Sequence, residues 1–311
     1  HQVGQDYLTD NGCEICYAPG FTPADIQSAV GDVNGVIMRA QGFADGPMMD
    51  AAPVLKVIGR HGIGVDNVDV PAATERGIYV VNTPTAPAEA VAEYVVGCLV
   101  ALPRRIHEAD PATRAADWDF RNRHHGPELI GKTIGIVGFG RIGRRIAEIC
   151  GLGFRMDVVY SDAIAAPAEE ESCLNAKKME LHELLEVSDF ISVNVPLIAE
   201  TRHLIGKAEF GRMKSTAYFV NCARGPVVDE PALVDALTSG QIAGAGIDVY
   251  EQEPVKPDNP LLKLNNVLLS PHSSGHSTEA AINLSLVAKD IVRVLRGETP
   301  ENPVNQPESL R

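Results

Sequence analysis

The sequence predicts an α/β protein built from two doubly wound parallel-sheet domains with a cleft between them. Two observations lead to this fold class. Short apolar runs typical of strands alternate with helical patterns along most of the chain, and one such run leads directly into a glycine-rich turn and a helix. The 311 residues are enough for two domains of ordinary size, and 45% hydrophobic content is typical of a globular protein.

Three strand-like runs come before the glycine-rich turn, at residues 35–38, 55–58 and 77–81. Each is followed by a loop, and most by a helical pattern, so we expect a parallel α/β unit of their own. Near the end of the chain, residues 278–295 have the apolar periodicity of one long helix, which could return to this first domain. We therefore assign residues 1–84 and 277–311 to the first domain.

The glycine-rich turn is the most informative segment of the chain. A strand at 134–137 leads into Gly138-x-Gly140-x-x-Gly143 and a helical pattern follows, with Arg141 and Ile142 at its start. Gly138 permits a tight turn, Gly140 lets backbone amides approach a pyrophosphate, and Gly143 lets the helix pack close to its strand. The free N–H groups of the helix N-terminus then face the anion. This pattern predicts a dinucleotide site of the Rossmann type.

Asp162 indicates which dinucleotide is used. A second short strand, 156–160, ends just before it, and Asp162 lies nineteen positions beyond Gly143, where a ribose-binding acid is expected. A carboxylate accepts hydrogen bonds from the ribose 2′-OH but repels a 2′-phosphate. The sequence therefore predicts NAD rather than NADP.

Further strands complete the second sheet, in a domain that we assign to residues 85–276. They are predicted at 190–195, 217–221, 245–248 and 267–270, with helices between them that include 181–187 and 231–238. A ligand of such a sheet lies outside the carboxyl ends of the strands, where the strand order reverses. The residues that follow these strands are Val195-Pro196, Cys222-Ala223-Arg224, Asp248 and Pro271-His272.

Three residues at these strand ends have side chains suited to the reduction of a carbonyl group. Arg224 can bind a carboxylate through two hydrogen bonds. Glu253 and His272 follow two later strands. A carboxylate beside an imidazole orients one ring nitrogen and favours the protonated ring, which leaves the other nitrogen to protonate a carbonyl oxygen. Taken singly, the three could also be a surface charge, a solvated loop acid and a rim histidine.

The composition disfavours several other classes of protein. The net charge of −14, from 27 basic and 41 acidic residues, would repel a nucleic acid. Cys13 and Cys16 lack the second ligand pair of a zinc site, and His272 and His276 lack the glutamate and helix of a metalloprotease pair, so no metal is expected. Because NAD and a carboxylate substrate are anions, local positive charge is needed, for which the candidates are Arg39, Arg60, Arg121, Arg123 and Arg224.

The sequence also predicts no membrane partner. The longest apolar stretch, near residues 90–102, is interrupted by Glu93 and stops at Pro103, which makes it too short and too polar to span a bilayer. The first residues lack the basic and apolar regions of a signal peptide, so we expect a cytoplasmic location.

Several sequence blocks resemble the D-2-hydroxyacid dehydrogenases over nearly the whole chain. They are Gly59-Arg-His-Gly-Ile-Gly-Val-Asp-Asn-Val-Asp69, Val81-Asn-Thr-Pro84, the glycine motif, Val220-Asn-Cys-Ala-Arg-Gly225, Asp248-Val-Tyr-Glu-Gln-Glu-Pro254 and Ser270-Pro-His272. The resemblance implies that Arg224 binds the 2-oxo acid and that Glu253 partners His272, which transfers the proton. It also implies that residues 85–276 bind NAD, that the remaining residues form the substrate-side lobe, and that the protein is a homodimer.

The expected contacts follow from the motif and the resemblance together. The cofactor-binding residues are predicted to be Gly138, Gly140, Arg141, Ile142, Gly143, Asp162, Val195, Pro196, Cys222, Ala223, Asp248 and Gly275, with residues 272–275 forming a turn along the cofactor. The substrate-binding residues are predicted to be Arg39, Arg60, His61, Gly62, Ile63, Arg121 and Arg224.

Within the family the chain looks most like the 3-phosphoglycerate dehydrogenases, through residues 36–39, the Gly59 block and residues 118–121. Two positions depart from that pattern. Ile63 replaces a threonine and His61 replaces a small residue, and such a bulkier, more basic loop could admit a second carboxylate or a sulfonate. The family usually opens with a strand, whereas His1 begins within a helical pattern, so we expect that a few residues precede it.

We therefore predict an NAD-dependent oxidoreductase that interconverts a D-2-hydroxy acid and its 2-oxo acid, with 3-phosphoglycerate and phosphohydroxypyruvate as the first choice. A reductase of hydroxypyruvate, glyoxylate or another 2-oxo acid is the first alternative. An NADH-gated binding protein is the second, because the C-terminal binding protein corepressors also resemble this family. Formate dehydrogenase is disfavoured, since formate oxidation needs no acid–base pair.

Overall fold

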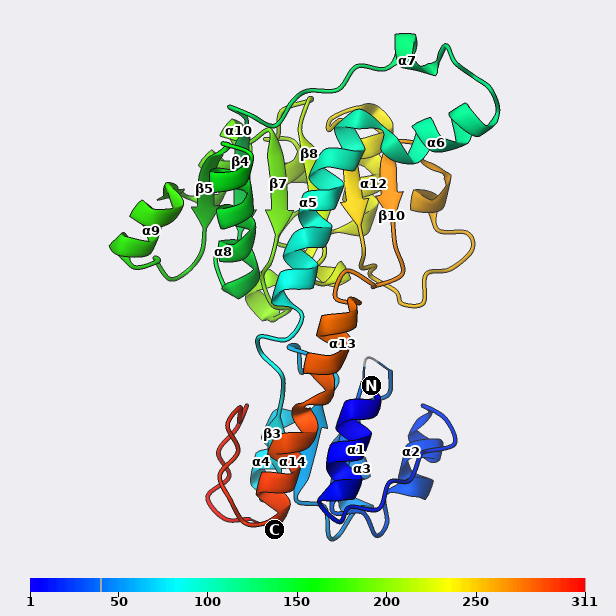
Figure 1. Ribbon diagram of the computed structural model, residues 1–311, viewed down its shortest axis with the longest axis vertical. Coiled ribbons are helices and arrows are strands. Elements are labelled where there is room, and N and C mark those ends of the chain that lie inside the picture. Colours follow the sequence, from blue (N-terminus) through cyan, green and yellow to red (C-terminus); the bar gives the residue numbers. More distant parts are fainter. Residues whose placement is uncertain (40, 311) are drawn as a thin grey trace. The chain divides into compact units, whose positions relative to one another are not determined.

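The computed structural model describes residues 1–39 and 41–310. The chain forms two compact units, one made of His1–Pro87 with His276–Arg311 and the other of Ala88–Gly275. Both contain a parallel sheet with helices packed on it, which confirms the predicted α/β class. Each unit is shown in Figure 1.

The second unit contains a seven-stranded sheet in the order β10-β9-β8-β7-β4-β5-β6, with every described pair parallel. Its strands are β4 (Thr133–Val137), β5 (Asp157–Ser161), β6 (Ala176–Lys178), β7 (Phe190–Val193), β8 (Tyr218–Asn221), β9 (Gly244–Ile247) and β10 (Val267–Leu269). From β4 the chain builds outward through β5 and β6, and then returns to the other side of β4 with β7. The reversal of strand order therefore lies between β4 and β7, where a ligand of such a sheet binds.

Helices cover both faces of this sheet, as expected for doubly wound strands (Figure 1). One face packs against α5 (Ala88–Arg104) and α8 (Arg141–Glu148), which continues as the short π-helix η1 (Ile149–Gly153). The other face packs against α10 (Leu181–Val187), α11 (Lys207–Phe210) and α12 (Glu230–Ser239). The strands are buried on both faces, which explains their nearly continuous apolar sequences.

The remaining elements of the second unit are short. They are α6 (Ile106–Arg114), α7 (Phe120–Arg123), α9 (Ala168–Leu174), η2 (Ala199–Thr201), η3 (Gly225–Val227) and η4 (Pro260–Lys263).

The first unit has a three-stranded parallel sheet in the order β1-β2-β3, formed by β1 (Gly35–Met38), β2 (Val57–Arg60) and β3 (Tyr79–Val81). Its helices are α1 (Gln2–Asp10), α2 (Pro23–Ala29), α3 (Gly46–Asp50), α4 (Val70–Glu75), α13 (Thr278–Ser285) and α14 (Val287–Leu295). Helix α14 packs on β2 and β3, and α1 packs on α13 and α14. The described strands of this sheet follow the order of the chain. The strand order reverses only in the sheet of the second unit, among the strands that the structure describes.

The single long helix predicted for 278–295 is wrong in one respect, because α13 and α14 are separated at Leu286. The hydroxyl of Ser285 donates to the carbonyl of Ile282 at 2.6 Å, the oxygen that the N–H of Leu286 would use in a continuous helix. The Leu286 N–H instead bonds to Asn283 O at 3.2 Å. The serine hydroxyl thus takes the carbonyl that the backbone would use, and the helix is interrupted although the apolar periodicity continues.

Most strands differ from the predicted bounds by one or two residues at an end, and two of the differences have a clear physical reason. Strand β2 begins at Val57 and ends at Arg60, because Leu55 is still part of a turn in which its N–H bonds to Ala52 O at 3.1 Å. Strand β6 has the sequence Ala-Lys-Lys and was not predicted, since its short, charged sequence is that of an edge strand rather than a core one.

Within residues 1–39 and 41–310, none of the helices has the length and apolar character required to cross a membrane.

Candidate active site

The glycine loop joins β4 to α8, and each of its three glycines has a separate structural reason. Gly138 has φ +92°, and a Cβ there would lie 2.8 Å from the backbone of Asn194. A Cβ on Gly143 would lie 2.2 Å from the carbonyl oxygen of Gly138, so only glycine lets α8 start this close to the loop. A Cβ on Gly140 would meet no described atom within 4 Å, so this part of the loop is open.

The N-terminus of α8 is suited to an anion. Its N-cap is Gly140, which has no side chain to occupy the first N–H groups of the helix. Arg141 is exposed and Ile142 half-buried in the first turn. These free N–H groups and an open glycine loop are the features that bind a pyrophosphate.

Asp162 directly follows β5 and is hydrogen-bonded to the glycine loop. Its Oδ2 accepts the N–H of Phe139 at 2.7 Å, and its Oδ1 accepts the N–H of Ile164 at 2.9 Å. The ring of Phe139 stacks on that of Tyr160 with their centroids 3.9 Å apart. The carboxylate is therefore held at the carboxyl end of β5, beside the loop that the sequence assigns to the pyrophosphate.

Arg224 is presented by a tight loop after β8. Asn221 shapes this loop, because its Oδ1 accepts the N–H of Ala223 at 3.0 Å and its Nδ2 donates to Arg224 O at 3.0 Å. A Cβ on Gly225 would lie 1.8 Å from the carbonyl oxygen of Tyr250. Glycine at 225 thus lets the loop that carries Arg224 pack directly on the loop that carries Glu253.

His272 and Glu253 form a close pair. The Nδ1 of His272 lies 2.8 Å from Oε2 of Glu253, and Oε1 of Glu253 accepts the N–H of Tyr250 at 3.1 Å. Because an ionised carboxylate only accepts hydrogen bonds, Nδ1 carries the hydrogen and Nε2 is left for a ligand. The His272 side chain is 40% exposed and the Glu253 side chain 37%, so solvent or a small molecule can reach the pair.

The electrostatics keep Glu253 ionised. Partial burial by itself would raise its pKa, but the hydrogen bond and charge of His272, the Tyr250 N–H and the charge of Arg224 together lower the pKa of Glu253 below its ordinary value. Arg224 therefore lies near enough to Glu253 to act on it electrostatically. The three residues predicted as catalytic are brought together in the second unit, at the carboxyl ends of β8, β9 and β10.

Asp248 supports the turn that carries His272. Its carboxylate is fully buried and accepts the Ser270 hydroxyl and the N–H groups of Ser273, at 2.8 Å, and Ser274, at 2.9 Å. His272 itself has φ +53°, and its N–H bonds to Asp248 O at 2.8 Å. The side-chain hydrogen bonds of the predicted cofactor residue Asp248 thus go to Ser270 and to this turn, while its N–H donates to Asn221 O at 3.1 Å.

The other predicted cofactor residues occupy the neighbouring strand ends. Val195 is half-buried and Pro196 exposed after β7. Cys222 is buried after β8, and burial raises the pKa of its thiol well above the ordinary value, so it is a neutral thiol. Ala223 and Gly275 are half-buried in the loops after β8 and β10.

Arg121 does not join this group of residues within the second unit. It lies in α7, where its guanidinium stacks over the exposed ring of Trp118 with 5.5 Å to the centroid. Figure 1 shows α6 and α7 at the opposite end of the sheet from the strand carboxyl ends. The Arg105 segment before α6 lines a small cavity with Tyr218 and Asn266, which lie at the amino ends of β8 and β10.

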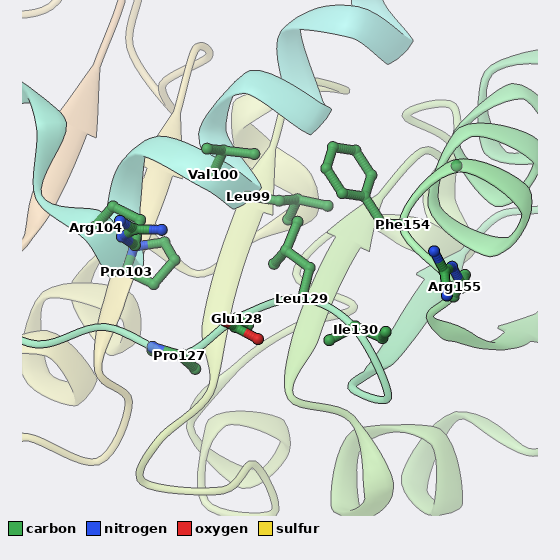
Figure 2. Close-up of a pocket in the computed structure, with 11 residues that line it drawn as sticks. Leu99, Val100, Pro103, Arg104, Pro127, Glu128, Leu129, Ile130, Phe154 and Arg155 are labelled. Atoms are coloured by element: carbon green, nitrogen blue, oxygen red, sulfur yellow. The ribbon is translucent and has the colours of Figure 1, made fainter.

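A larger cavity of about 310 Å³ also lies away from Arg224 and His272. Figure 2 shows Leu99, Val100 and Pro103 of α5 facing Leu129 and Phe154 across it, with Arg104 and Arg155 at its edge. Leu129 and Ile130 come just before β4, so this cavity lies at the amino ends of the strands. The candidate site is therefore identified by its side chains and not by either of these cavities.

The predicted substrate loop of the first unit is held by its own contacts. Asn82 Nδ2 donates to Ile63 O at 2.7 Å, the Thr83 N–H donates to Gly62 O at 3.1 Å, and a guanidinium nitrogen of Arg60 donates to His61 O. Burial, with the charges of Arg39 and Arg60, lowers the pKa of His61 to about 4. His61 is therefore neutral at neutral pH, and the positive charge here comes from the arginines.

The residues around the glycine loop fit a dinucleotide. They provide an open glycine loop, the free N–H groups of the α8 N-terminus and the carboxylate of Asp162, which is held by hydrogen bonds.

Among residues 1–39 and 41–310, no group of three or more His, Cys, Asp or Glu side chains is arranged to hold a metal ion.

Three residues that hold the loops of the site were not predicted as site residues. They are Asn221, Tyr250 and Ser270. Asn221 and Ser270 are polar residues at the ends of apolar strands, a signal that could have pointed to them. The role of Tyr250 rests on its backbone N–H, which no side-chain pattern reveals.

Comparison with known proteins identifies the family of the chain. Residues 96–274 match the family described as D-isomer specific 2-hydroxyacid dehydrogenase, NAD binding domain. The chain is 40% identical to a D-3-phosphoglycerate dehydrogenase of Archaeoglobus fulgidus over 97% of its length and 57% of that protein. It is 47% identical to a glyoxylate reductase of Thermofilum pendens over 84% of its length and 78% of that protein. The chain thus spans little more than half of the first relative.

Solved structures are similar over almost the whole chain. The TT0316 protein of Thermus thermophilus superposes with a TM-score of 0.90 at 36% identity, covering 97% of this chain and 96% of that one. The holo form of D-mandelate dehydrogenase from Rhodotorula graminis superposes with a TM-score of 0.89 at 30% identity, covering 99% and 95%.

Proposed function

The chain belongs to the D-isomer specific 2-hydroxyacid dehydrogenases, and from that premise we propose that it interconverts a D-2-hydroxy acid and its 2-oxo acid with a nicotinamide dinucleotide. The observation that carries this proposal is the His272–Glu253 pair beside Arg224, with 2.8 Å between the imidazole and the carboxylate. Its geometry is that of an acid–base pair next to a carboxylate-binding cation.

In this proposal each residue has one role. Arg224 binds the carboxylate of the 2-oxo acid and orients its carbonyl group. His272 donates a proton from Nε2 to the carbonyl oxygen, and Glu253 keeps Nδ1 protonated and stabilises the charged ring before transfer. The bound cofactor supplies the hydride for the carbonyl carbon. In the oxidative direction, neutral His272 takes the hydroxyl proton.

NAD is the proposed cofactor in preference to NADP. The support is Asp162, whose carboxylate is held beside the glycine loop by the Phe139 N–H at 2.7 Å. A negative charge at this position favours a ribose 2′-OH and repels a 2′-phosphate.

For the substrate, we infer phosphohydroxypyruvate and 3-phosphoglycerate as the first choice. Support comes from the relative named D-3-phosphoglycerate dehydrogenase and from the cationic loop with Arg39 and Arg60. The relative named glyoxylate reductase, at 47% identity, supports glyoxylate or hydroxypyruvate as the second choice. The roles of His61, Gly62, Ile63 and Arg121 in binding the substrate stay predictions, as do the homodimer and the cytoplasmic location.

The test is the loss of Arg224. We expect Arg224→Ala to lower kcat/KM for the 2-oxo acid by at least about a hundredfold, because a charged partner of the substrate carboxylate is removed. The dissociation constant of NADH, measured by fluorescence titration, should change little. Arg224→Lys is the matched control, and it should recover only part of the activity since it keeps the charge without the two-pronged geometry. Unchanged turnover in Arg224→Ala would refute the assignment.

A further inference from the structure

A second histidine–carboxylate pair lies next to the candidate active site. The Nε2 of His203 is 2.6 Å from Oε1 of Glu251. His203 belongs to the connection that follows β7, and Glu251 to the loop after β9, two residues before Glu253. Neither residue is part of the predicted site.

The backbone around His203 is fixed to the segment that follows Arg224. The His203 N–H donates to Pro226 O at 2.8 Å, and the Ile205 N–H donates to Val227 O at 3.2 Å. His203 adopts φ +52°, in the left-handed region where histidine and asparagine are among the more frequent non-glycine residues. The imidazole is thus presented from an anchored backbone rather than from a loose loop.

Glu251 is held by its backbone as well. Its N–H donates to Oε2 of Glu230 at 3.1 Å, and the other oxygen of Glu230 accepts from Asn259 at 2.7 Å. The preceding carbonyl, that of Tyr250, lies against Gly225 so closely that a Cβ on Gly225 would be 1.8 Å away. The 250–251 segment is therefore fixed by α12, by the Arg224 loop and by His203.

This segment determines the position of the proton-transfer pair. The Tyr250 N–H donates to Glu253 Oε1 at 3.1 Å, while Glu253 Oε2 faces His272 at 2.8 Å. The charged groups around the segment include Asp248 at the end of β9, Glu230 of α12, Arg224 of the loop after β8, and His272 of the turn after β10. A shift of the 250–251 backbone would move the N–H that orients the Glu253 carboxylate.

We propose that His203 is a positioning residue for the acid–base pair: by binding Glu251 it holds the 250–251 backbone in the position from which Tyr250 orients Glu253. The inference rests on the proposed dehydrogenase function of Glu253 and His272. His203 touches neither substrate nor cofactor in this account, and acts through Glu251.

The direct test is the titration of Glu253 in the full chain. Selective ¹³C labelling of glutamate carboxyls, with Glu253→Gln to assign the signal, gives its pKa by NMR without any turnover. His203→Asn removes the contact with Glu251, because asparagine is too short to reach it, yet tolerates the left-handed backbone. We expect the pKa of Glu253 to rise toward its ordinary value in His203→Asn and in Glu251→Ala.

Kinetics supply the second readout. In both variants we expect kcat for 2-oxo acid reduction to fall by about two- to fivefold, as for the loss of a partly exposed polar contact, and the acid limb of the pH profile to move to higher pH. The double variant His203→Asn/Glu251→Ala should be no worse than either single one. His182→Asn is the matched control, because His182 also faces a glutamate, Glu209, at 3.6 Å, and should leave both readouts as in the parent.

The outcomes separate the two claims. If Glu253 has the same pKa in His203→Asn as in the parent and turnover is normal, the positioning role of His203 is overturned. The proposed function is then unaffected. If the pKa of Glu253 shifts in His203→Asn but the parent chain reduces no 2-oxo acid, the positioning role of His203 is supported and the proposed function is refuted. A fall in kcat with no shift of the acid limb also overturns the proposal, since a merely structural loss would produce it.

Discussion

Glu253 accepts two hydrogen bonds, one at each carboxylate oxygen, from the Tyr250 N–H and from Nδ1 of His272. Its neighbours outweigh the effect of partial burial, so the native pKa is lower than that of the same residue in an unfolded chain. The contribution of this carboxylate to the pair is fully present above the unfolded pKa and is lost as pH falls through the lower, native pKa.

We therefore predict that 2-oxo acid reduction persists on acidification until pH falls below the ordinary range of a glutamate, about pH 4.3, where Glu253 is protonated. The measurement is kcat/KM against pH in the parent and in Glu253→Gln. An acid limb of the same position and depth in both proteins would contradict the role of Glu253.

Asp162 is the residue expected to determine the choice between NAD and NADP. Asp162→Asn keeps an oxygen that can accept the Phe139 N–H, but it removes the charge that repels a 2′-phosphate. We expect the ratio of kcat/KM for NADPH to that for NADH to rise by roughly tenfold. The comparison requires both cofactors at one ionic strength, and a ratio equal to that of the parent would show that this carboxylate does not select the cofactor.

At the scale of elements, the site depends on the packing of two loops, those after β8 and β9. The contact is made at Gly225, whose missing Cβ lets its backbone approach Tyr250 O. Arg224 and Glu253 are brought into electrostatic range by this approach rather than by any contact within one element.

We predict that Gly225→Ala lowers the free energy of unfolding by about 1–3 kcal/mol, since the added methyl group must displace backbone. Activity should fall as well, because the two loops separate. Gly97→Ala is the matched control: Gly97 is an exposed glycine inside α5 with no described atom within 4 Å of an added Cβ, so stability should rise by about 0.5–1 kcal/mol. Thermal unfolding of both variants measures this, and an undamaged Gly225→Ala would contradict the loop argument.

Elements with a clear apolar period were predictable from the sequence, and those decided by single polar groups were not. The strands of the second sheet are buried on both faces, so their apolar runs located them to within a few residues. The break at Leu286 depends on one hydroxyl of Ser285, and β6 is a charged edge strand. Neither leaves a signal in hydrophobic periodicity.

The same limit applies to the site. Arg224, Glu253 and His272 follow strands of one parallel sheet, and topology requires such strand ends to share an edge, so their convergence was predictable. His203 and Tyr250 were not found, because one acts through a neighbouring loop and the other through its backbone. Arg121 lies in α7, at the other end of the sheet of the second unit from these strand ends, and its role in binding the substrate stays a prediction.

For the whole molecule, a net charge of −14 is combined with a proposed reaction between anions. The cations proposed for this reaction are Arg224 in the second unit and Arg39 and Arg60 in the first. Because these arginines attract an anionic substrate in a chain of net negative charge, the charge of the tail of the 2-oxo acid should affect the rate. Salt screens this attraction, so KM for a phosphorylated acid should rise with ionic strength.

The proposed dehydrogenase activity is tested by the oxidation of NADH by the parent chain with phosphohydroxypyruvate, hydroxypyruvate, glyoxylate and oxaloacetate in parallel, followed by the loss of NADH absorbance. A 2-hydroxyacid dehydrogenase with the Arg224–Glu253–His272 site should reduce at least one of them rapidly, and phosphohydroxypyruvate best. Tight NADH binding without oxidation by any of the four would contradict the proposed activity and favour an NADH-gated binding protein.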